Sequence, residues 1–306
     1  MVSVVILTKN EEQDLPGCLE SLSWSDDIHV YDSYSTDQTV EIARNRGAQV
    51  TQRCFDDWSS HQNWGVANIS FRHPWVFYLD ADERVTTELA ASIQEAVEYP
   101  GNKVAFRVKR RDFWGERWLK HAVTSSYYMR LFRPEKMRYE RLVNPVSIPD
   151  GPVGELAGYL DHHPFSKGMT HWLTRHNSYS SLEAQQIEKN RTAKQRFSLR
   201  QAFLAKDSNQ RRFHQKELFY RIPARPLLKF LLLYVGKRGF LDGSAGFTYA
   251  MLQSFYEFMI VLKSKELTGK SAFSTRAMEA PATVVLNPGA ARQTLEGFHA
   301  NSGSSD

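Results

Sequence analysis

The sequence has few cysteines and no long apolar run, and each shortage narrows the class of protein. Two cysteines, Cys18 and Cys54, occur in 306 residues, which disfavours a disulfide framework or a cysteine metal site. We interpret both as structural thiols in a reducing compartment. The longest uninterrupted apolar run falls far short of the roughly 20 residues that cross a bilayer, so we expect no transmembrane helix.

Further absences bear on partners and location. The sequence contains no internal repeat and no recognised nucleic-acid-binding module, so nucleic acid is not an expected partner. The first predicted strand begins almost at the initiator methionine, and we therefore expect no signal peptide. Together with the two thiols, these features predict a cytoplasmic protein.

Basic residues are scarce in the first 100 residues, and acidic residues are scarce in residues 187–270. Residues 1–100 contain six Lys and Arg against 17 Asp and Glu, whereas residues 187–270 contain 17 against six. The basic region interleaves its charges with apolar residues, several of which share one helical face: Met251, Leu252, Phe255, Phe258, Met259 and Leu262. We favour amphipathic helices that lie on an anionic membrane surface. Ordinary packing against the rest of the chain, with solvated charges, is the alternative.

Short apolar runs alternate with helical patterns in the first 80 residues. Strands are predicted over residues 2–7, 28–31 and 48–51, and helical spacing follows the first two. Such alternation predicts an α/β fold with a mostly parallel central sheet flanked by helices. Polar clusters then fall at the carboxyl ends of strands, where open sheets bind ligands.

The most informative of these clusters is the pair Asp80 and Asp82. A buried strand that starts at Trp75 ends in the two carboxylates, which are spaced one residue apart. Residues two apart in a strand point to the same side, so the pair is suited to share one hard divalent cation, or to divide a metal and a ribose. Two aspartates that merely cap a loop are the alternative for so short a motif.

Several motifs together resemble the family 2 inverting glycosyltransferases of the GT-A fold. These are Val-Ser-Val-Val-Ile-Leu-Thr-Lys-Asn-Glu-Glu from Val2, Asp-Ser-Tyr-Ser-Thr-Asp-Gln-Thr from Asp32 and Leu-Asp-Ala-Asp-Glu from Leu79. Within that family the chain is most similar to the lipopolysaccharide-core β-1,4-glucosyltransferase-like group. The resemblance covers most of residues 1–270.

The resemblance implies a nucleotide-sugar site along the three motifs. Thr8, Asn10 and Glu11 are expected to flank the nucleotide, and Asp32 and Ser33 to face its base and ribose. Asp80 is expected near the ribose and metal.

The resemblance also implies that Asp82 ligates Mg²⁺ or Mn²⁺, with Asp80 beside it. Such an ion would offset the repulsion between a diphosphate and a carboxylate-rich sheet edge.

The sequence departs from the family pattern at the general base. An inverting transfer needs a base for the acceptor hydroxyl, and relatives commonly carry His-Glu where this chain has Asn144-Pro145. We therefore consider Glu140, Asp150 and Glu155 as substitutes and favour Asp150, because Asp-Gly is typical of a turn that projects into a cleft.

An acceptor cleft is expected in the aromatic and basic segment after residue 105. Trp118 is the candidate platform for stacking a sugar ring, and Arg130 and Arg133 are candidates for holding phosphate. The alternative for any single aromatic residue is the core.

These observations divide the chain into three parts. Residues 1–186 are expected to form the GT-A nucleotide-sugar-binding and catalytic domain. Residues 187–270 are expected to form a basic amphipathic helical extension that contacts the membrane interface, and residues 271–306 a mobile tail.

The predicted activity is inverting, metal-dependent transfer of a hexose, expected to be glucose, from a UDP-sugar donor. The predicted acceptor is a lipid-linked, lipopolysaccharide or exopolysaccharide saccharide at the cytoplasmic face of the inner membrane. The alternatives are a catalytically inactive sugar-nucleotide-binding or scaffold subunit of a polysaccharide assembly complex, and a metal-dependent nucleotidyltransferase.

Overall fold

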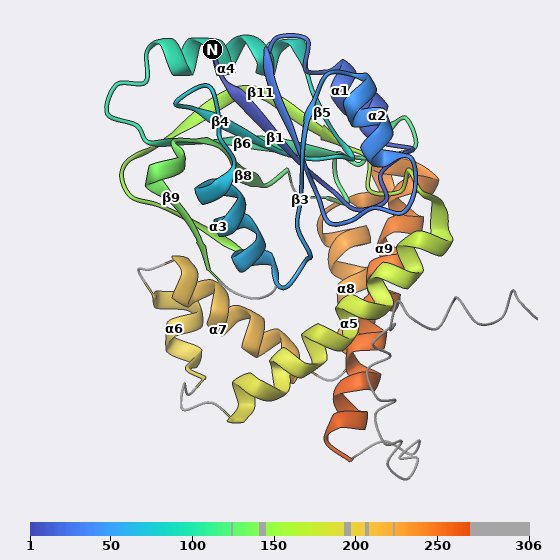
Figure 1. The fold of residues 1–306 in the computed structure, drawn as a ribbon. Coiled ribbons are helices and arrows are strands. Elements are labelled where there is room, and N and C mark those ends of the chain that lie inside the picture. The colour runs from blue at the N-terminus through green and yellow to red at the C-terminus, as the bar shows by residue number, and fades with distance from the viewer. Residues whose placement is uncertain (124, 141–144, 193–196, 206–207, 223, 270–306) are drawn as a thin grey trace, which may run out of the picture.

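The computed structural model describes residues 1–123, 125–140, 145–192, 197–205, 208–222 and 224–269. The predicted tail, residues 271–306, lies outside the described residues. Figure 1 shows a sheet with helices on both faces, and a group of C-terminal helices below one edge of that sheet.

The main sheet has the strand order β3-β2-β1-β4-β8-β6-β11-β5, with β7 paired to β6. Neighbours pair in parallel except where β8 or β5 is involved, and in the β6–β7 hairpin. The prediction of a mostly parallel α/β sheet is therefore confirmed. The strands are β1 (Ser3–Thr8), β2 (Asp27–Asp32), β3 (Gln49–Gln52), β4 (Val76–Asp80), β5 (Glu83–Val85), β6 (Ala105–Trp114), β7 (Arg117–Trp118), β8 (Tyr127–Phe132) and β11 (Val153–His162). A separate antiparallel pair is formed by β9 (Met137–Glu140) and β10 (Val146–Pro149).

Burial on both faces explains the continuous apolar character of the first strands. On one face, Val4 and Ile6 of β1 join a core with α1 (Leu15–Glu20) and α4 (Thr87–Glu98). On the other face, Val5 packs in a second core that includes Ile69, just after α3 (Trp58–Asn68). The remaining helix of this part, α2 (Thr39–Asn45), begins after the loop that follows β2.

Two helices of this part, α3 and α4, begin with a side-chain cap. The Asp57 side chain accepts a hydrogen bond from the Ser60 N–H at the start of α3, and Thr86 accepts one from the Leu89 N–H at the start of α4. These caps satisfy amides that have no partner within the helix.

Register defines two edges of the sheet. Val76, Phe132, Ala105 and Val153 pair in a row across the starts of β4, β6 and β11 and the end of β8. We call this row the amino edge. The opposite, carboxyl edge contains the last residues of β1, β2, β4 and β11, together with Asp112.

The C-terminal part is helical. Its elements are α5 (Gly168–Thr192), α6 (Leu199–Leu204), α7 (Ser208–Arg221), α8 (Arg225–Leu231), the short turns η2 (Leu232–Gly236) and η3 (Gly239–Asp242), and α9 (Gly243–Leu267). One further short turn, η1 (Pro134–Lys136), precedes β9. Helix α9 packs on α5, α8 and η3. Helix α5 runs without a break through residue 186, the domain boundary predicted from the sequence. Within the described ranges, no helix combines the length and apolarity needed to cross a membrane.

Candidate active site

The ends of β1 and β2 are joined through Asp32. Its carboxylate is fully buried and accepts hydrogen bonds from the Thr8 hydroxyl at 2.9 Å, from the Ser35 amide at 2.9 Å and from the Ser35 hydroxyl. Gln52 of β3 donates a further bond at 2.9 Å. Burial opposes ionisation of Asp32, but these bonds hold its pKa below the ordinary value. Asp32 is thus an ionised carboxylate that links the ends of β1, β2 and β3.

The loops after β1 and β2 bind each other through backbone and side-chain groups. Asn10 has a positive φ of 55°, and its side-chain oxygen accepts a hydrogen bond from the Thr36 N–H at 2.8 Å. The Ser33 amide donates to the Thr8 carbonyl at 2.9 Å. The structure therefore brings Thr8, Asn10, Asp32 and Ser33 together at the ends of β1 and β2.

Glu11 lies in the same loop and contacts a distant segment. Lys167, which follows β11, is 2.5 Å from the Glu11 carboxylate and donates to the Asn10 carbonyl at 2.7 Å. Burial raises the pKa of Glu11 to about 7, against the opposing effect of Lys167. Lys167 therefore links the segment after β11 to the loop that is expected to flank the nucleotide.

Asp80 is held by a buried ion-pair network at the end of β4. Arg130 of β8 donates to Asp80 at 2.8 Å and to Glu83 at 2.5 Å, and the Asp80 amide donates to Glu83 at 3.0 Å. Glu83 is fully buried, while 37% of the Asp80 side chain is exposed. Burial raises the pKa of Glu83 and Arg130 opposes that rise. Asp80 is consequently the member of this network that faces solvent.

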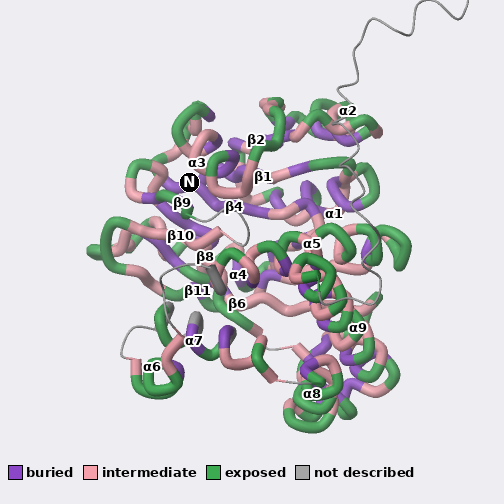
Figure 2. The backbone as a smooth tube through the Cα atoms, turned by 90° about the horizontal axis from the view of Figure 1, so that it is seen from below, coloured by how far each residue is buried: buried purple, intermediate pink, exposed green. Residues whose placement is uncertain are grey.

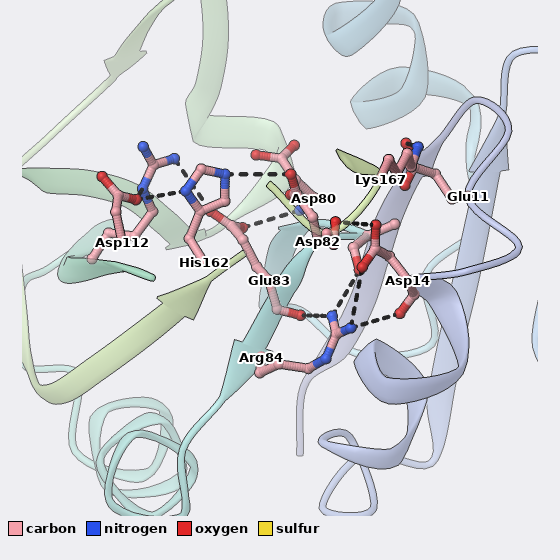
Figure 3. A network of polar contacts seen from close by, with 12 residues as sticks. Glu11, Asp14, Asp80, Asp82, Glu83, Arg84, Asp112, His162 and Lys167 are labelled. Carbon is pink, nitrogen blue, oxygen red and sulfur yellow. Dashed lines mark hydrogen bonds and ion pairs between the residues drawn. The ribbon is translucent and has the colours of Figure 1, made fainter. Parts of the chain in front are cut away.

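Asp82 is held by a different partner, His162, at the end of β11. Because β4 ends at Asp80 and the chain turns at Asp82, the expectation that both aspartates share one continuous strand is wrong. His162 lies 3.4 Å from Asp82 through Nε2 and 2.5 Å from Asp112 through Nδ1 (Figure 3). The end of β4 and the turn after it still place Asp80 and Asp82 at the carboxyl edge of the sheet.

The electrostatics of this trio favour three charged groups. Burial lowers the pKa of His162, but the flanking carboxylates outweigh burial and raise it to about 9. Burial disfavours the charged form of Asp82, yet His162 holds the pKa of Asp82 well below its usual range. Asp112 pairs with His162 and also lies 3.1 Å from Arg110.

The donor set suits a divalent cation that takes most of its ligands from elsewhere. Within the part of the chain that the structure describes, no group of three or more His, Cys, Asp or Glu converges as a metal site. Asp80 and Asp82 each have one carboxylate oxygen, Oδ1, with no hydrogen-bond partner among the described residues. Mg²⁺ is commonly held by one or two carboxylates together with substrate phosphates and water. Two carboxylates, one of them beside a histidine that is itself oriented by Asp112, fit that mode of binding.

The three candidates for the general base lie away from this cluster or beside residues outside the described ranges. Asp150, in a bend before β11, pairs with Lys136 at 2.9 Å, and Glu155 pairs with Arg107 at 2.6 Å, both near the amino edge. Glu155 pairs with Arg107, five positions before the Asp112 that pairs with His162, which amounts to roughly 17 Å along β6. Glu140 ends β9 and is exposed, and residues 141–144 next to it lie outside the described residues.

The structure also separates the three candidates for acceptor contacts. Arg130 is 5% exposed and holds Asp80 and Glu83. Trp118 lies in the β6–β7 hairpin, 5.4 Å from the Arg111 guanidinium. Arg133 stacks over Trp75 at the amino edge. Of the three, Arg130 is the candidate that contacts Asp80, whereas Trp118 pairs with Phe113, next to Asp112.

Sequence reasoning did not single out Asp112, Arg110 or His162 as site residues. Asp112 pairs in register with His162 across β6 and β11. A polar residue late in each of two long strands was the available signal, but their pairing is not visible in the sequence.

Comparison with known proteins gives a consistent result. The profile described as Glycosyl transferase family 2 matches residues 3–154. The lipopolysaccharide core biosynthesis glycosyltransferase LpsC of Rhizobium meliloti is 28% identical over 273 residues, which cover 86% of this chain and 91% of that protein. An uncharacterized glycosyltransferase of Rickettsia typhi is 23% identical and covers 88% of each chain.

Two solved structures are more distant. Residues 1–349 of S. aureus TarS align with 89% of this chain and 92% of that chain, at 14% identity and a TM-score of 0.37. Glucosyl-3-phosphoglycerate synthase of Mycobacterium tuberculosis, solved with Mn²⁺, UDP-glucose and phosphoglyceric acid, aligns with 36% of this chain and 44% of that chain. Its identity is 21% and its TM-score is 0.32.

Proposed function

Residues 3–154 form a glycosyl transferase family 2 domain, and from this premise we propose that the protein transfers a hexose, expected to be glucose, from a UDP-sugar with inversion at the anomeric carbon. The proposed acceptor is a saccharide of lipopolysaccharide or exopolysaccharide that is linked to lipid. The similarity to LpsC over most of both chains supports the lipopolysaccharide acceptor.

The observation that carries the proposal is the arrangement of carboxylates at the carboxyl edge. Asp80 and Asp82 follow a buried strand, and each keeps an oxygen available beside the loops that contain Asn10 and Ser33. Ligands of open α/β sheets bind at this edge. A sugar nucleotide placed there would lie with its base toward Asp32 and its diphosphate toward Asp82.

A divalent cation is part of the proposal. Asp82 and Asp80 would hold Mg²⁺ or Mn²⁺, and the ion would supply positive charge that stabilises the departing nucleoside diphosphate. The chain's own contribution is orientation: Arg130 holds Asp80, and His162 holds Asp82. Lys167 pairs with Glu11 and so holds the loop that would flank the nucleotide.

The general base stays a prediction to be tested. Replacing Glu140, Asp150 and Glu155 singly by their amides is the test set. Because Asp150 and Glu155 lie near the amino edge, we now expect E140Q to reduce turnover most. If all three variants keep full turnover, the base is none of these residues.

We also propose that the protein acts at the cytoplasmic face of the inner membrane as a peripheral protein. The support is the basic composition of residues 187–270 and the exposed apolar side chains of α8 and α9. A lipid-linked acceptor would then be presented at the same surface.

A donor screen tests the proposed reaction. The protein is incubated with each nucleotide sugar, Mn²⁺ and a lipid extract, and release of UDP is measured together with the anomeric configuration of the product. We expect consumption of one UDP-hexose and an inverted product. Release of pyrophosphate would indicate a nucleotidyltransferase, and binding of UDP without turnover would indicate a scaffold subunit.

A matched pair of variants ties that activity to the site. D82N is expected to lower kcat by roughly 100-fold or more, because it removes charge from the proposed metal ligand. D26N is the control, since Asp26 is partly exposed just before β2, at the amino edge. Equal activity of D82N and D26N would overturn the assignment of Asp82.

A further inference from the structure

A cavity of about 950 Å³ lies between the carboxyl edge of the sheet and the C-terminal helices. Arg110 and Asp112 of β6 line it from the sheet side. Arg211 of α7 and Lys229 of α8 line it from the helical side, together with Lys237 after η2. The cavity is therefore assembled from residues of β6 and from residues of the helical side that follow them by 99 positions or more in the sequence.

The charge of the cavity is strongly positive. Four cationic side chains line it, and Asp112 is the one carboxylate among the described residues of its wall. Asp112 pairs with His162 and lies 3.1 Å from Arg110, which also lies 3.6 Å from Glu83. The cations of the helical side therefore carry most of the positive charge of the cavity. Burial, followed by the charge of Lys229, lowers the pKa of Lys237. Placing like charges around one space is unfavourable unless an anion enters it.

The position of the cavity relates it to the carboxylate pair. Asp112 contacts His162, and His162 contacts Asp82 (Figure 3). In the strand order, β8 and β6 lie on one side of β4, whereas β1 and β2 lie on the other. The loops expected to hold the nucleotide follow β1 and β2, so the cavity occupies the side of Asp80 and Asp82 that the nucleotide leaves open.

We propose that this cavity binds a phosphoryl group carried by the acceptor, so that the acceptor of this protein is an anionic saccharide. The inference rests on the proposed function, because it assigns a role to the acceptor side of the same site. Arg211 offers a forked guanidinium donor suited to phosphate, and the two lysines supply point charges. Arg110 lies against Asp112 and Glu83 and adds positive charge at the sheet side of the cavity. The phosphoryl group has two chemical sources, a phosphate on the sugar or the diphosphate that links a sugar to a lipid carrier.

Calorimetric titration of the full chain tests the proposal. The nucleotide site is first saturated with UDP and Mg²⁺, and glucose 6-phosphate, farnesyl diphosphate and glucose are then titrated separately. We expect at least one phosphorylated probe to bind about tenfold or more tightly than glucose, because charge-assisted bonds form only with the phosphate. Preference for glucose 6-phosphate assigns the phosphate to the sugar, and preference for farnesyl diphosphate assigns it to the carrier.

Variants show whether the binding occurs in this cavity. R211A and K229A are each expected to weaken the preferred probe by about fivefold. K265A, which removes an exposed lysine of α9 that does not line the cavity, should bind like the wild type. Arg211 is exposed on α7, so R211A keeps the test informative if K229A disturbs folding.

The outcomes separate this proposal from the proposed function. Equal affinity for glucose and both phosphorylated probes overturns the cavity assignment, even if UDP binds and sugar is transferred. An equal loss of affinity in K265A and R211A also overturns it. If UDP fails to bind, the proposed function fails, and the same titration without nucleotide still decides whether the cavity takes phosphate.

Discussion

Arg130 organises the acidic cluster from within the protein. Its guanidinium donates to Asp80 and Glu83 and lies 4.9 Å from the centre of the Tyr78 ring. Glu83 has no exposure to solvent, so removal of Arg130 would leave a buried carboxylate without its closest positive charge. This residue therefore positions Asp80 and stabilises the fold at the same time.

We expect R130L to lower the free energy of unfolding by about 3–5 kcal/mol, because breaking a buried ion pair strands the remaining charge. Urea denaturation followed by tryptophan fluorescence measures the change. R138L is the control: Arg138 is exposed and pairs with exposed Glu140, and its loss should cost about 1 kcal/mol or less. Equal losses in the two variants would show that the Arg130 network adds nothing beyond a surface pair.

At the scale of elements, His176 connects α5 to α9. Its ring stacks on Trp172 at 3.6 Å between ring centres and meets Tyr256 of α9 edge-on at 5.1 Å. Burial lowers the pKa of His176 to about 4, against a smaller opposing effect of the Trp172 carbonyl. The ring is thus neutral in the folded protein at neutral pH.

This shift predicts a pH-dependent stability of the α5–α9 contact. The unfolded chain takes up a proton near pH 6.5 and the folded chain only near pH 4, so the contribution is complete above pH 6.5. This contribution to stability is lost as the pH falls from about 6.5 to about 4. The full shift corresponds to about 3 kcal/mol, and solvent screening of the partly exposed ring lowers the expected change in stability to on the order of 2 kcal/mol. Thermal unfolding across this range should show a flatter profile for H176F than for the wild type. H171F alters an exposed histidine of the same helix and should keep most of the wild-type slope.

The start of α9 depends on a close approach at Gly246. A Cβ atom at this position would overlap the carbonyl oxygen of Gly239 and lie 2.8 Å from Asp242 Cβ. Asp242 in turn accepts hydrogen bonds from the amides of His121 at 2.9 Å and Ala122 at 2.7 Å. The packing of α9 on η3 therefore sets the position of the loop at residue 122, which borders the cavity.

We expect G246A to destabilise the protein by about 1–3 kcal/mol, because the added methyl group forces α9 away from η3. G236A is the matched control, since the nearest atom to its Cβ is 3.5 Å away and the glycine has no positive φ. Its effect should lie within about 1 kcal/mol of zero. Denaturant unfolding of both variants decides the matter, and a stable G246A would mean that α9 can shift at little cost.

At the scale of the whole molecule, exposed apolar side chains concentrate on the C-terminal helices. Figure 2 shows largely exposed and intermediate backbone over α8. The exposed apolar side chains between residues 227 and 241 are Leu227, Leu228, Leu231, Leu232, Val235, Phe240 and Leu241. Lys229, Lys237 and Arg238 lie in the same stretch. Apolar side chains rimmed by cations are typical of a surface that rests on an anionic bilayer.

Co-sedimentation with vesicles tests this surface. We expect the protein to bind vesicles that contain anionic lipid at low salt, and raised salt to weaken binding because it screens the cationic part. L231D is expected to weaken binding by about tenfold or more, since it removes one inserted leucine. Y99D alters an exposed residue after α4, outside residues 187–270, and should leave binding unchanged. If the protein stays in the supernatant with anionic vesicles at low salt, the membrane proposal is wrong.

The order of strands and helices in the first 80 residues could be predicted from the sequence. Strands expected over residues 2–7, 28–31 and 48–51 occur at Ser3–Thr8, Asp27–Asp32 and Gln49–Gln52. Local apolar runs carry this information because strands buried on both faces need them. The motifs at the strand ends also identified the family, as the profile match over residues 3–154 confirms.

The partners of the site residues could not be predicted in the same way. Arg130 was expected at the acceptor and instead holds Asp80, while His162 reaches Asp82 from a strand 80 residues later. The favoured turn at Asp150 exists as a bend, but register places it near the amino edge. Each of these outcomes depends on strand pairing between distant segments, which leaves no local pattern in the chain.

By itself, the sequence determined the family, the parallel half of the sheet and the gathering of Asp32, Asp80 and Asp82 at one edge, because the carboxyl ends of parallel strands share that edge. Only the tertiary structure decided which cation orients each carboxylate, which base candidates lie far from the site, and that basic residues of the C-terminal helices form a cavity with β6. The physical reason is that short-range hydrophobic patterns specify which segments form strands and helices. Ion pairs and cavities instead depend on side chains that meet only after the chain has packed.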